Sequence, residues 1–314
     1  MSDYLPEGLR IDLPENLAYL KNMQTLQEAQ RLGKILEARA VVCDSSHNLQ
    51  VDLGFTRALM PKEECALGIR EGYTRDISII SRVNKPVCFV ITGFTQQGGR
   101  QVPLLSRRLV QERCQREYLS HLVPGDIIDA RVTHLESFGC FVDIGCGIPS
   151  LISIDAISVS RISHPGDRMS VGQNIRAVVR DFGEHGRITL THKELLGTWE
   201  ENAALFSPGE TVAGIVRSVE EYGIFVELTP NLAGLAEPKD QVTVGQQASV
   251  YIKSMIPEKM KVKLIIVDAF HASYHPREFH YFVQGNHLSH WQYSPTGCRK
   301  TVQTWFDPPG SDQP

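Results

Sequence analysis

Aromatic residues stand at a fixed spacing in two places, and they carry the clearest binding chemistry in the chain. Phe138 and Phe141 occur in the run Ser-Phe-Gly-Cys-Phe-Val-Asp-Ile, and Tyr222 and Phe225 occur in the run Glu-Tyr-Gly-Ile-Phe-Val-Glu-Leu. Small apolar residues alternate with Phe141, which predicts a strand that turns its phenyl ring away from the core. Such rings form an exposed apolar surface, and surfaces of that kind mark binding sites.

Histidines offer a second possible chemistry near the end of the chain. His271 and His275, like His287 and His290, have a spacing that metal ligands can adopt. No cysteine or carboxylate cluster accompanies them, so we expect no metal and no cofactor. The expected structure after residue 269 is an irregular cap or an added strand on the preceding domain. A metal site is one alternative, and a tail whose aromatic residues extend the binding surface is another.

Motifs of the common enzyme classes are missing from the sequence. It contains no GxxxxGK[ST] phosphate loop, no GxSxG nucleophile elbow and no HExxH metal motif. The paired acids Glu63 and Glu64, and Glu220 and Glu221, lie at predicted turns, where we expect solvated side chains. A ribonuclease would need clustered carboxylates for two metal ions. We therefore expect a protein that is not an enzyme.

The composition restricts how the chain could bind a polyanion. Among 314 residues, 32 Lys and Arg face 36 Asp and Glu, giving a net charge of -4, while 42% of residues are hydrophobic. Binding of nucleic acid through an overall positive charge is thus excluded, and any nucleic-acid site must be confined to one part of the surface. No apolar run is long enough to span a membrane and no signal peptide pattern begins the chain, which predicts a cytoplasmic protein. The seven scattered cysteines are expected to be reduced core residues.

An internal repeat supplies the elements that must hold the aromatic residues. Pro-Gly-Asp-Ile-Ile-Asp-Ala-Arg-Val, starting at Pro124, matches Pro-Gly-Glu-Thr-Val-Ala-Gly-Ile-Val, starting at Pro208, and the two aromatic runs and two Val-Gly-Gln runs follow in the same order. A weaker copy begins at Gly33 and lacks the aromatic run. The sequence therefore contains two clear repeats and one divergent repeat.

Each repeat consists of short segments rich in β-branched residues and separated by turn residues. In the second repeat we expect strands near 126–135, 139–144, 149–153, 174–180 and 187–192. Five short strands in so few residues favour a closed Greek-key barrel of the OB type. Gly98 and Gly99 are typical of a hairpin turn.

Helices are expected only between and before the barrels. One should run over 17–38 into the first barrel strand, and a linker helix should carry Arg107, Arg108, Arg113 and Arg116 away from its apolar stripe. These arginines are predicted to form a solvated face, or alternatively a stripe along phosphates. The fold class is thus mainly β, with three tandem five-stranded OB-fold barrels and short linker helices. The expected parts are an extension at 1–32, barrels at 33–107, 124–196 and 208–268, linkers at 108–123 and 197–207, and a tail at 269–314.

The repeats resemble the S1-type RNA-binding domain, a module first described in a bacterial ribosomal protein. The opening Pro-Gly-Asp/Glu, the aromatic-Gly-x-Phe strand and the closing Arg-Ile-Thr-Leu-Thr-His-Lys that starts at Arg187 carry the resemblance, which covers about residues 33–268. The resemblance implies single-stranded RNA binding on one barrel face. Phe138 and Phe141, and Tyr222 and Phe225, would stack on bases, at about 1–3 kcal/mol per base.

Polar contacts implied by the resemblance are less regular. The second repeat keeps Asp181 and Arg187, which could instead form only a surface ion pair, but Ser153 stands where a histidine is usual. The third repeat has Glu237, Ser254 and Lys261 at the corresponding positions, and Lys253, Lys259 and Lys263 lie near Lys261. From this set, Lys253 and Lys261 are the predicted phosphate contacts.

The divergent repeat differs from the other two in charge. Residues 33–107 hold ten basic and seven acidic residues, a net +3, whereas 124–196 hold seven and nine and 208–268 hold six and eight, a net -2 each. The first copy is thus expected to attract phosphates weakly or to dock on a partner. The linker residues Trp199 and Phe206 are expected to pack between repeats two and three.

These features together predict a monomeric RNA-binding protein. The resemblance implies that it holds messenger RNA near the small ribosomal subunit during translation initiation. Two alternatives remain open, namely an RNA-binding regulator or chaperone away from the ribosome, and an accessory that docks RNA for a separate nuclease.

Overall fold

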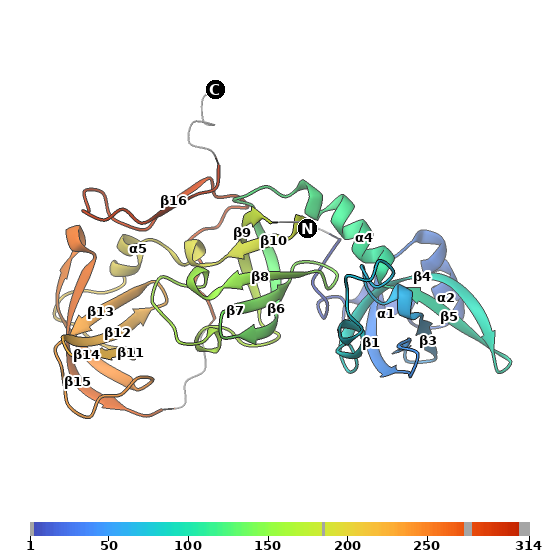
Figure 1. Ribbon diagram of the computed structural model, residues 1–314, viewed down its shortest axis with the longest axis horizontal. Coiled ribbons are helices and arrows are strands. Elements are labelled where there is room, and N and C mark those ends of the chain that lie inside the picture. The colour runs from blue at the N-terminus through green and yellow to red at the C-terminus, as the bar shows by residue number, and fades with distance from the viewer. Residues whose placement is uncertain (1–2, 184–185, 273–277, 308–314) are drawn as a thin grey trace, which may run out of the picture. The chain divides into compact units, whose positions relative to one another are not determined.

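The computed structural model describes residues 3–183, 186–272 and 278–307. In this part of the chain the architecture is mainly β, with few and short helices (Figure 1). The chain divides into two compact units. One unit comprises Met1–Leu122 and Asp143–Pro149, and the other comprises Val123–Val142 and Ser150–Pro314.

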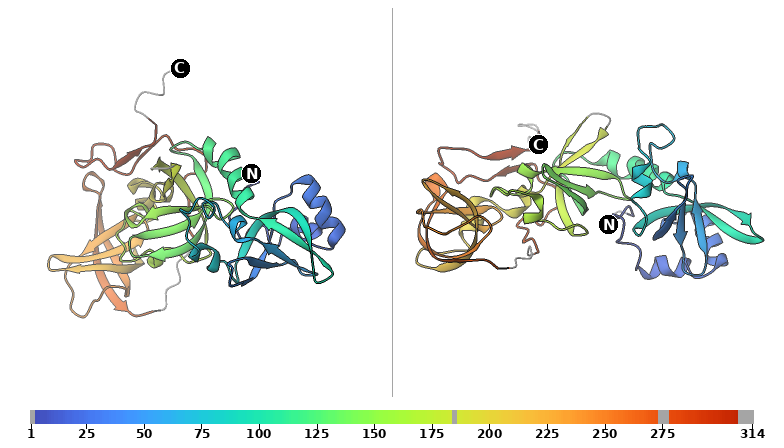
Figure 2. Two further views of the ribbon diagram at one scale, coloured as in Figure 1. Left: turned by 45° about the vertical axis from the view of Figure 1, so that its right-hand side comes forward. Right: turned by 60° about the horizontal axis from the view of Figure 1, so that its bottom comes forward.

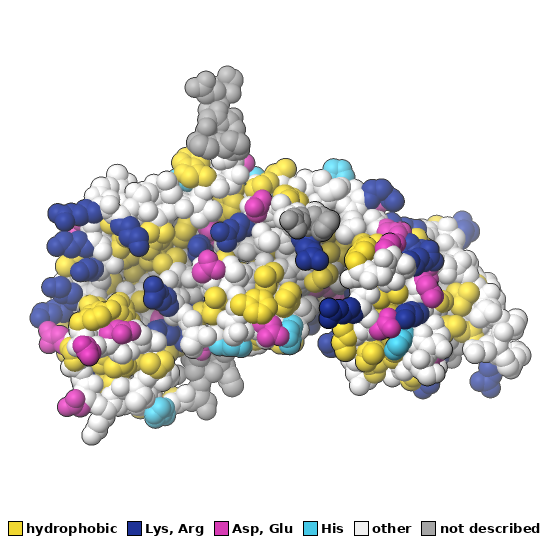
Figure 3. Space-filling model, in the orientation of Figure 1, with side chains coloured by type: hydrophobic (Ala, Val, Ile, Leu, Met, Phe, Trp, Pro, Cys, Tyr) yellow, Lys and Arg dark blue, Asp and Glu magenta, His cyan; other side chains and the backbone are white. Residues whose placement is uncertain are grey.

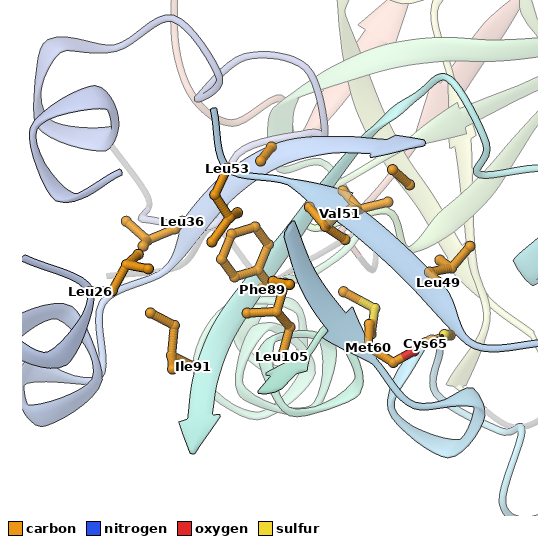
Figure 4. Packing of buried hydrophobic residues seen from close by; sticks show 14 of the residues in the cluster. Leu26, Leu36, Leu49, Val51, Leu53, Met60, Cys65, Phe89, Ile91 and Leu105 are labelled. Carbon is orange, nitrogen blue, oxygen red and sulfur yellow. Dashed lines mark hydrogen bonds between the residues drawn. The ribbon is translucent and has the colours of Figure 1, made fainter. Parts of the chain in front are cut away.

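The first unit contains a closed barrel of five strands. Its strands are β1 (Leu36–Cys43), β2 (Leu49–Asp52), β3 (Arg57–Met60), β4 (Pro86–Gln97) and β5 (Arg100–Ser106). Gly98 and Gly99 join the last two strands with φ values of 57° and 77°, the left-handed pair that a two-residue hairpin turn needs. Phe89 lies at the centre of the core with Leu36, Leu105 and their neighbours around it (Figure 4).

The helices of this unit are α1 (Pro14–Tyr19), α2 (Met23–Leu32), η1 (Lys62–Glu64), α3 (Ile77–Ile80), α4 (Arg108–Glu117) and η2 (Leu119–His121). The prediction of one helix over 17–38 was wrong. Asn22 caps a new helix, because its side chain accepts a hydrogen bond from the backbone N–H of Thr25. Gly33 ends this helix in a left-handed conformation with φ of 61°. The chain then enters β1, whose first three residues, Leu36, Glu37 and Ala38, are all buried.

The second and third barrels belong to the other unit, apart from the 143–149 turn. The second barrel is formed by β6 (Ile127–Glu136), β7 (Gly139–Asp143), β8 (Pro149–Ser153), β9 (Asn174–Phe182) and β10 (Ile188–Thr191). The third is formed by β11 (Thr211–Glu220), β12 (Gly223–Thr229), β13 (Leu232–Ala236), β14 (Gln247–Ile256) and β15 (Lys261–Phe270). The strands predicted for the second repeat agree with these bounds to within two residues at each end.

All three barrels share one strand order. Each closes as first, second, third, fifth and fourth strand, and the third and fifth strands pair in parallel. Closure leaves no free sheet edge in any of them. The repeat found in the sequence therefore corresponds to a repeated five-stranded barrel.

Short helices and a terminal hairpin complete this unit. They are η3 (Ile154–Ala156), η4 (Pro165–Asp167), η6 (Lys193–Leu196), α5 (Trp199–Ala203), η7 (Pro257–Lys259), β16 (His290–Gln292) and β17 (Gln303–Trp305). No helix within the described residues is long and apolar enough to cross a membrane.

Two linker arginines do not lie on a solvated face, and that part of the prediction was wrong. The Arg107 side chain is 4% exposed, and its Nε and Nη2 donate to the Glu7 carboxylate over 2.6 Å and 3.0 Å. Burial disfavours the charge of Arg107, but the Glu7 carboxylate more than offsets this and raises the pKa of the guanidinium. Arg108 is 11% exposed and pairs with Glu64, so Glu64 is not solvated either.

The described part of the tail packs on both barrels of its unit, not only on the third. Tyr281, Val283, Leu288 and Phe306 form an apolar cluster with Val178 and Leu195 of the second barrel. Trp291 and Tyr293 join the core of the third barrel, as do Trp199 and Phe206 of the linker. Figure 2 shows this segment, in dark red, running beside the two barrels. The tail was predicted to cap the third repeat, and its described part also covers a face of the second barrel.

Candidate nucleic-acid interface

A glycine beside each aromatic pair lets the second and third strands come close. A Cβ atom on Gly139 would lie 2.4 Å from the carbonyl oxygen of Ile152, and one on Gly223 would lie 2.6 Å from that of Ala236. Both distances are too short for a side chain. The aromatic-Gly-x-Phe pattern thus has a structural cause for its glycine, and the close approach fixes where the aromatic residues leave the sheet.

The two aromatic pairs have nearly the same geometry. The Phe138 and Phe141 ring centroids lie 6.1 Å apart at 89°, and those of Tyr222 and Phe225 lie 6.2 Å apart at 85°. Phe138 is 54% exposed and Tyr222 is 69% exposed, whereas the second ring of each pair is half-buried. The half-buried ring supports the exposed one edge to face, which leaves a flat aromatic face open to solvent.

The residues between the rings point into the barrel, as the alternation predicted. Cys140, Val142, Ile224 and Val226 are completely buried. Because the inward positions are filled by these side chains, Phe141 and Phe225 are not needed to fill either barrel core. Their outward position therefore calls for a role other than core packing.

His134 belongs to the same surface but was not found from the sequence. Its imidazole ring stacks on Phe141 with centroids 6.5 Å apart at 30°, and its Nε2 lies 2.7 Å from a Glu136 carboxylate oxygen. A lone histidine in a strand gives no signal of its own. The outward positions of the neighbouring strand β6 could have identified it.

Asp181 and Arg187 are exposed residues that flank the hairpin between β9 and β10. Asp181 lies opposite Thr189, two residues beyond Arg187 along the chain. The Asp181 carboxylate accepts from the backbone N–H of Phe182, and within the described residues it forms no ion pair with Arg187. The loop residues 184–185 lie outside the described part. Thr189 pairs with Leu151 of β8, so Arg187 lies beside the sheet that carries the phenylalanines.

The lysines of the third barrel lie on one continuous outer surface. Lys253, Lys261 and Lys263 point outward from β14 and β15, and Lys259 lies in the turn between these strands. Figure 3 shows basic side chains, in dark blue, gathered over this barrel at the left of the view. No carboxylate lies within ion-pair distance of these four lysines among the described residues. They are therefore available to anionic ligands.

Other predicted contact positions are less suited to a phosphate. Ser153 is half-buried, and its hydroxyl interacts with the Asp155 carboxylate, which contributes to lowering the pKa of Asp155. Glu237 is exposed on the third barrel. In the first barrel no aromatic pair stands on β2; an exposed row of Arg39, Asp52 and Arg57 crosses β1, β2 and β3 instead.

Two of the tail histidines that were considered as metal ligands, His287 and His290, have other partners. His287 lies between Asp126 and Asp307, at 2.8 Å and 3.5 Å, and His290 stacks on Trp305 at 3.8 Å between ring centroids. His275 lies outside the described residues. Among the described ones, no group of three or more His, Cys, Asp or Glu side chains could hold a metal ion.

Comparison with known proteins identifies the second barrel. Residues 122–193 match the family model described as the S1 RNA binding domain. The chain is 28% identical over 232 residues to the small ribosomal subunit protein bS1 of Rhizobium meliloti, covering 68% of this chain and 39% of that protein. It is 27% identical over 263 residues to the bS1 protein of Staphylococcus aureus, covering 78% of this chain and 64% of that protein.

A solved multidomain protein with nucleic acid binding domains from Streptococcus pneumoniae is also similar, at 15% identity over 75% of this chain and 74% of that chain, with a TM-score of 0.25. The chain spans less than two thirds of the length of the bS1 relatives named above. The family match falls on the barrel that carries Phe138 and Phe141, so this barrel is an S1 RNA binding domain, and the similarity to bS1 proteins extends over most of the chain.

Proposed function

We propose that the chain binds single-stranded RNA by stacking bases on the aromatic pairs of its second and third barrels. The observation that carries the proposal is the repeated geometry of Phe138 with Phe141 and of Tyr222 with Phe225, each with one ring more than half exposed. Aromatic rings stack on any base, because every base has a π-face. A chain with a net charge of -4 can therefore bind RNA without bulk electrostatic attraction.

Charged residues would complete the two sites by contacting phosphates and base edges. Arg187 and Asp181 flank the second barrel's site, and Lys253 and Lys261 flank that of the third. Each barrel is inferred to be an OB-type module. Since the two barrels lie on one chain, a strand long enough to reach both would bind more tightly than to either alone.

The biological role that we propose is messenger RNA binding at the small ribosomal subunit during translation initiation, in the cytoplasm. The similarity to bS1 proteins supports this role. We further propose that the chain is not an enzyme and acts as a monomer. Association with ribosomal particles can be measured by sedimentation of cell extract. Absence of the protein from the small-subunit fraction, with and without messenger RNA, would favour a regulator that acts away from the ribosome.

The stacking mechanism is tested by replacing Phe138 and Phe141 with alanine in the full chain. Affinity for a labelled single-stranded RNA should fall by about 1–3 kcal/mol per lost stack, while the thermal unfolding midpoint stays close to that of the unchanged protein. Phe55→Ala is a matched control, because Phe55 is 44% exposed on the first barrel, outside the proposed sites. Unchanged affinity together with a large loss of stability would show that the two rings are structural.

A further inference from the structure

The third barrel has an exposed apolar surface that the aromatic pair does not include. Tyr251 on β14 is 37% exposed, Ile265 on β15 is 44% exposed and Val267 is 57% exposed. Tyr251 and Ile265 are direct cross-strand partners. The core-facing positions of the same strands, such as Ile252 and Leu264, are buried, so the exposed set is not required for closing the barrel.

Strand register makes this surface continuous with the aromatic pair. Phe225 pairs with Leu235 on β13, and Leu235 pairs with Lys263 on β15. Lys263 and Ile265 point to the same side of β15, since both alternate with buried residues. The outer face therefore runs without interruption from β12 over β13 and β15 to Tyr251 on β14. Along this route three strand spacings lie between β12 and β14, a path of about 15 Å over the barrel surface.

Charge along this surface matches a phosphate chain. Lys253 lies two residues from Tyr251 on the same strand and occupies the bulge opposite Lys263. Neither lysine has a carboxylate within ion-pair distance among the described residues. An anionic strand that crosses β15 would meet both lysines on its way to the Tyr251 ring.

The position equivalent to Tyr251 is covered in the second barrel. Val178 pairs with Ile127, and Tyr251 pairs with Thr211, so Val178 and Tyr251 occupy equivalent positions on the fourth strands. The same offset of 84 residues relates Ile127 to Thr211 and the two Pro-Gly openings (211 − 127 and 209 − 125). Val178 is completely buried and packs in the cluster that contains Tyr281 of the tail. The tail thus covers in one barrel the face that the other leaves open.

We propose that RNA bound at Tyr222 and Phe225 continues over β15 onto β14, where Tyr251 stacks on a further base and Lys253 contacts the adjoining phosphate. This proposal rests on the proposed function and extends it. It gives the third barrel a longer footprint than the second, because the equivalent path on the second barrel is closed by the tail.

The experiment uses the full chain carrying Phe138→Ala and Phe141→Ala, so that the third barrel dominates binding. In this background Tyr251→Ala is compared for two single-stranded RNAs, one of about four and one of about twelve nucleotides, within the range of sites on one such barrel. Affinity for the longer RNA should fall about 5- to 150-fold, the equivalent of one lost stack, and affinity for the shorter RNA should change little. Tyr251→Phe keeps the ring and should restore the affinity for the longer RNA.

Two further variants separate the possible failures. Tyr73→Ala removes another exposed tyrosine ring, 69% exposed on the first unit. It should leave the affinities for the shorter and the longer RNA unchanged. If Tyr251→Ala binds the longer RNA as its parent does while Phe225→Ala weakens binding, RNA does not reach β14 and the proposal is overturned. If Phe225→Ala also has no effect, the proposed function of the third barrel fails as well. Loss of affinity in Tyr251→Ala that Tyr251→Phe does not restore would equally overturn base stacking there.

Discussion

Asn231 connects three segments of its unit, and its replacement by alanine is a demanding test of how that unit is held together. The residue lies in the turn between β12 and β13 and is completely buried. Its Oδ1 accepts from the backbone N–H of Val159 over 2.9 Å, and its Nδ2 donates to the carbonyl oxygens of Lys193 and Gly197, each over 2.8 Å. One amide thus ties the third barrel to a loop of the second barrel and to the linker between them.

The expected cost follows from these three bonds. Asn231→Ala removes all of them and leaves one N–H and two carbonyl groups without this partner, the Gly197 carbonyl in a buried position and the other two groups in part-buried ones. A hydrogen bond contributes about 0.5–1.5 kcal/mol net, and an unsatisfied buried group costs more. We expect the free energy of unfolding to fall by about 3–5 kcal/mol, a large part of the 5–15 kcal/mol typical of a domain. The bond from Tyr293 Oη to the backbone carbonyl of Asn231 should remain.

Urea unfolding followed by tryptophan fluorescence measures this loss directly. Trp199 and Trp291 are both buried in the core of the third barrel, so their emission reports on this unit. Asn174→Ala, an exposed asparagine of the second barrel, is the matched control and should change stability by no more than about 0.5 kcal/mol. A similarly small loss for Asn231→Ala, with an unchanged denaturant slope, would refute the assigned role of the amide.

Three further perturbations have expected outcomes. Glu7→Ala leaves Arg107 charged and buried, and should lower the stability of the first unit by about 3–5 kcal/mol in thermal or urea unfolding; a loss below 1 kcal/mol would contradict the buried pair. Burial lowers the pKa of His192 from 6.5 to about 4, so the unfolded chain binds a proton that the folded chain does not. The free energy of unfolding should therefore fall by about 3 kcal/mol as the pH decreases from 6.5 to 4, and His192→Gln should show a weaker pH dependence. Lys253→Ala with Lys261→Ala should make the plot of log affinity against log salt shallower by about 1.4, at about 0.7 for each phosphate contact on a single strand; an unchanged slope would place phosphates elsewhere.

Local patterns were sufficient to predict the barrels and the outward aromatic positions. The period of two along β7 separates Cys140 and Val142 from Phe141, and the same pattern recurs along β12. The roles of the eight predicted contact residues remain predictions, since their positions alone do not establish contact with RNA.

Long-range partners could not be predicted, because they depend on which segments meet in space. Helical spacing placed Arg107 on a solvated face, but Glu7, a hundred residues earlier, binds it in the interior. The cover over Val178 was missed for the same reason. The tail has no periodic pattern, and its contacts are made one residue at a time, as when Arg176 donates to the carbonyl oxygens of Val283 and Gly285 over 2.8 Å and 2.6 Å.

These internal contacts also bear on how charge could contribute to RNA binding. In the second barrel Arg168 pairs with buried Glu227, Arg176 binds tail carbonyls, and Lys193 binds the Asp155 carbonyl oxygen. These three basic residues hold the fold, so under the proposed stacking mechanism Arg187 is the basic residue of that barrel that we expect to contact RNA. In the third barrel the outward lysines have no carboxylate partner among the described residues. The salt dependence of binding should accordingly arise mainly there, although both repeats carry the same net charge of -2.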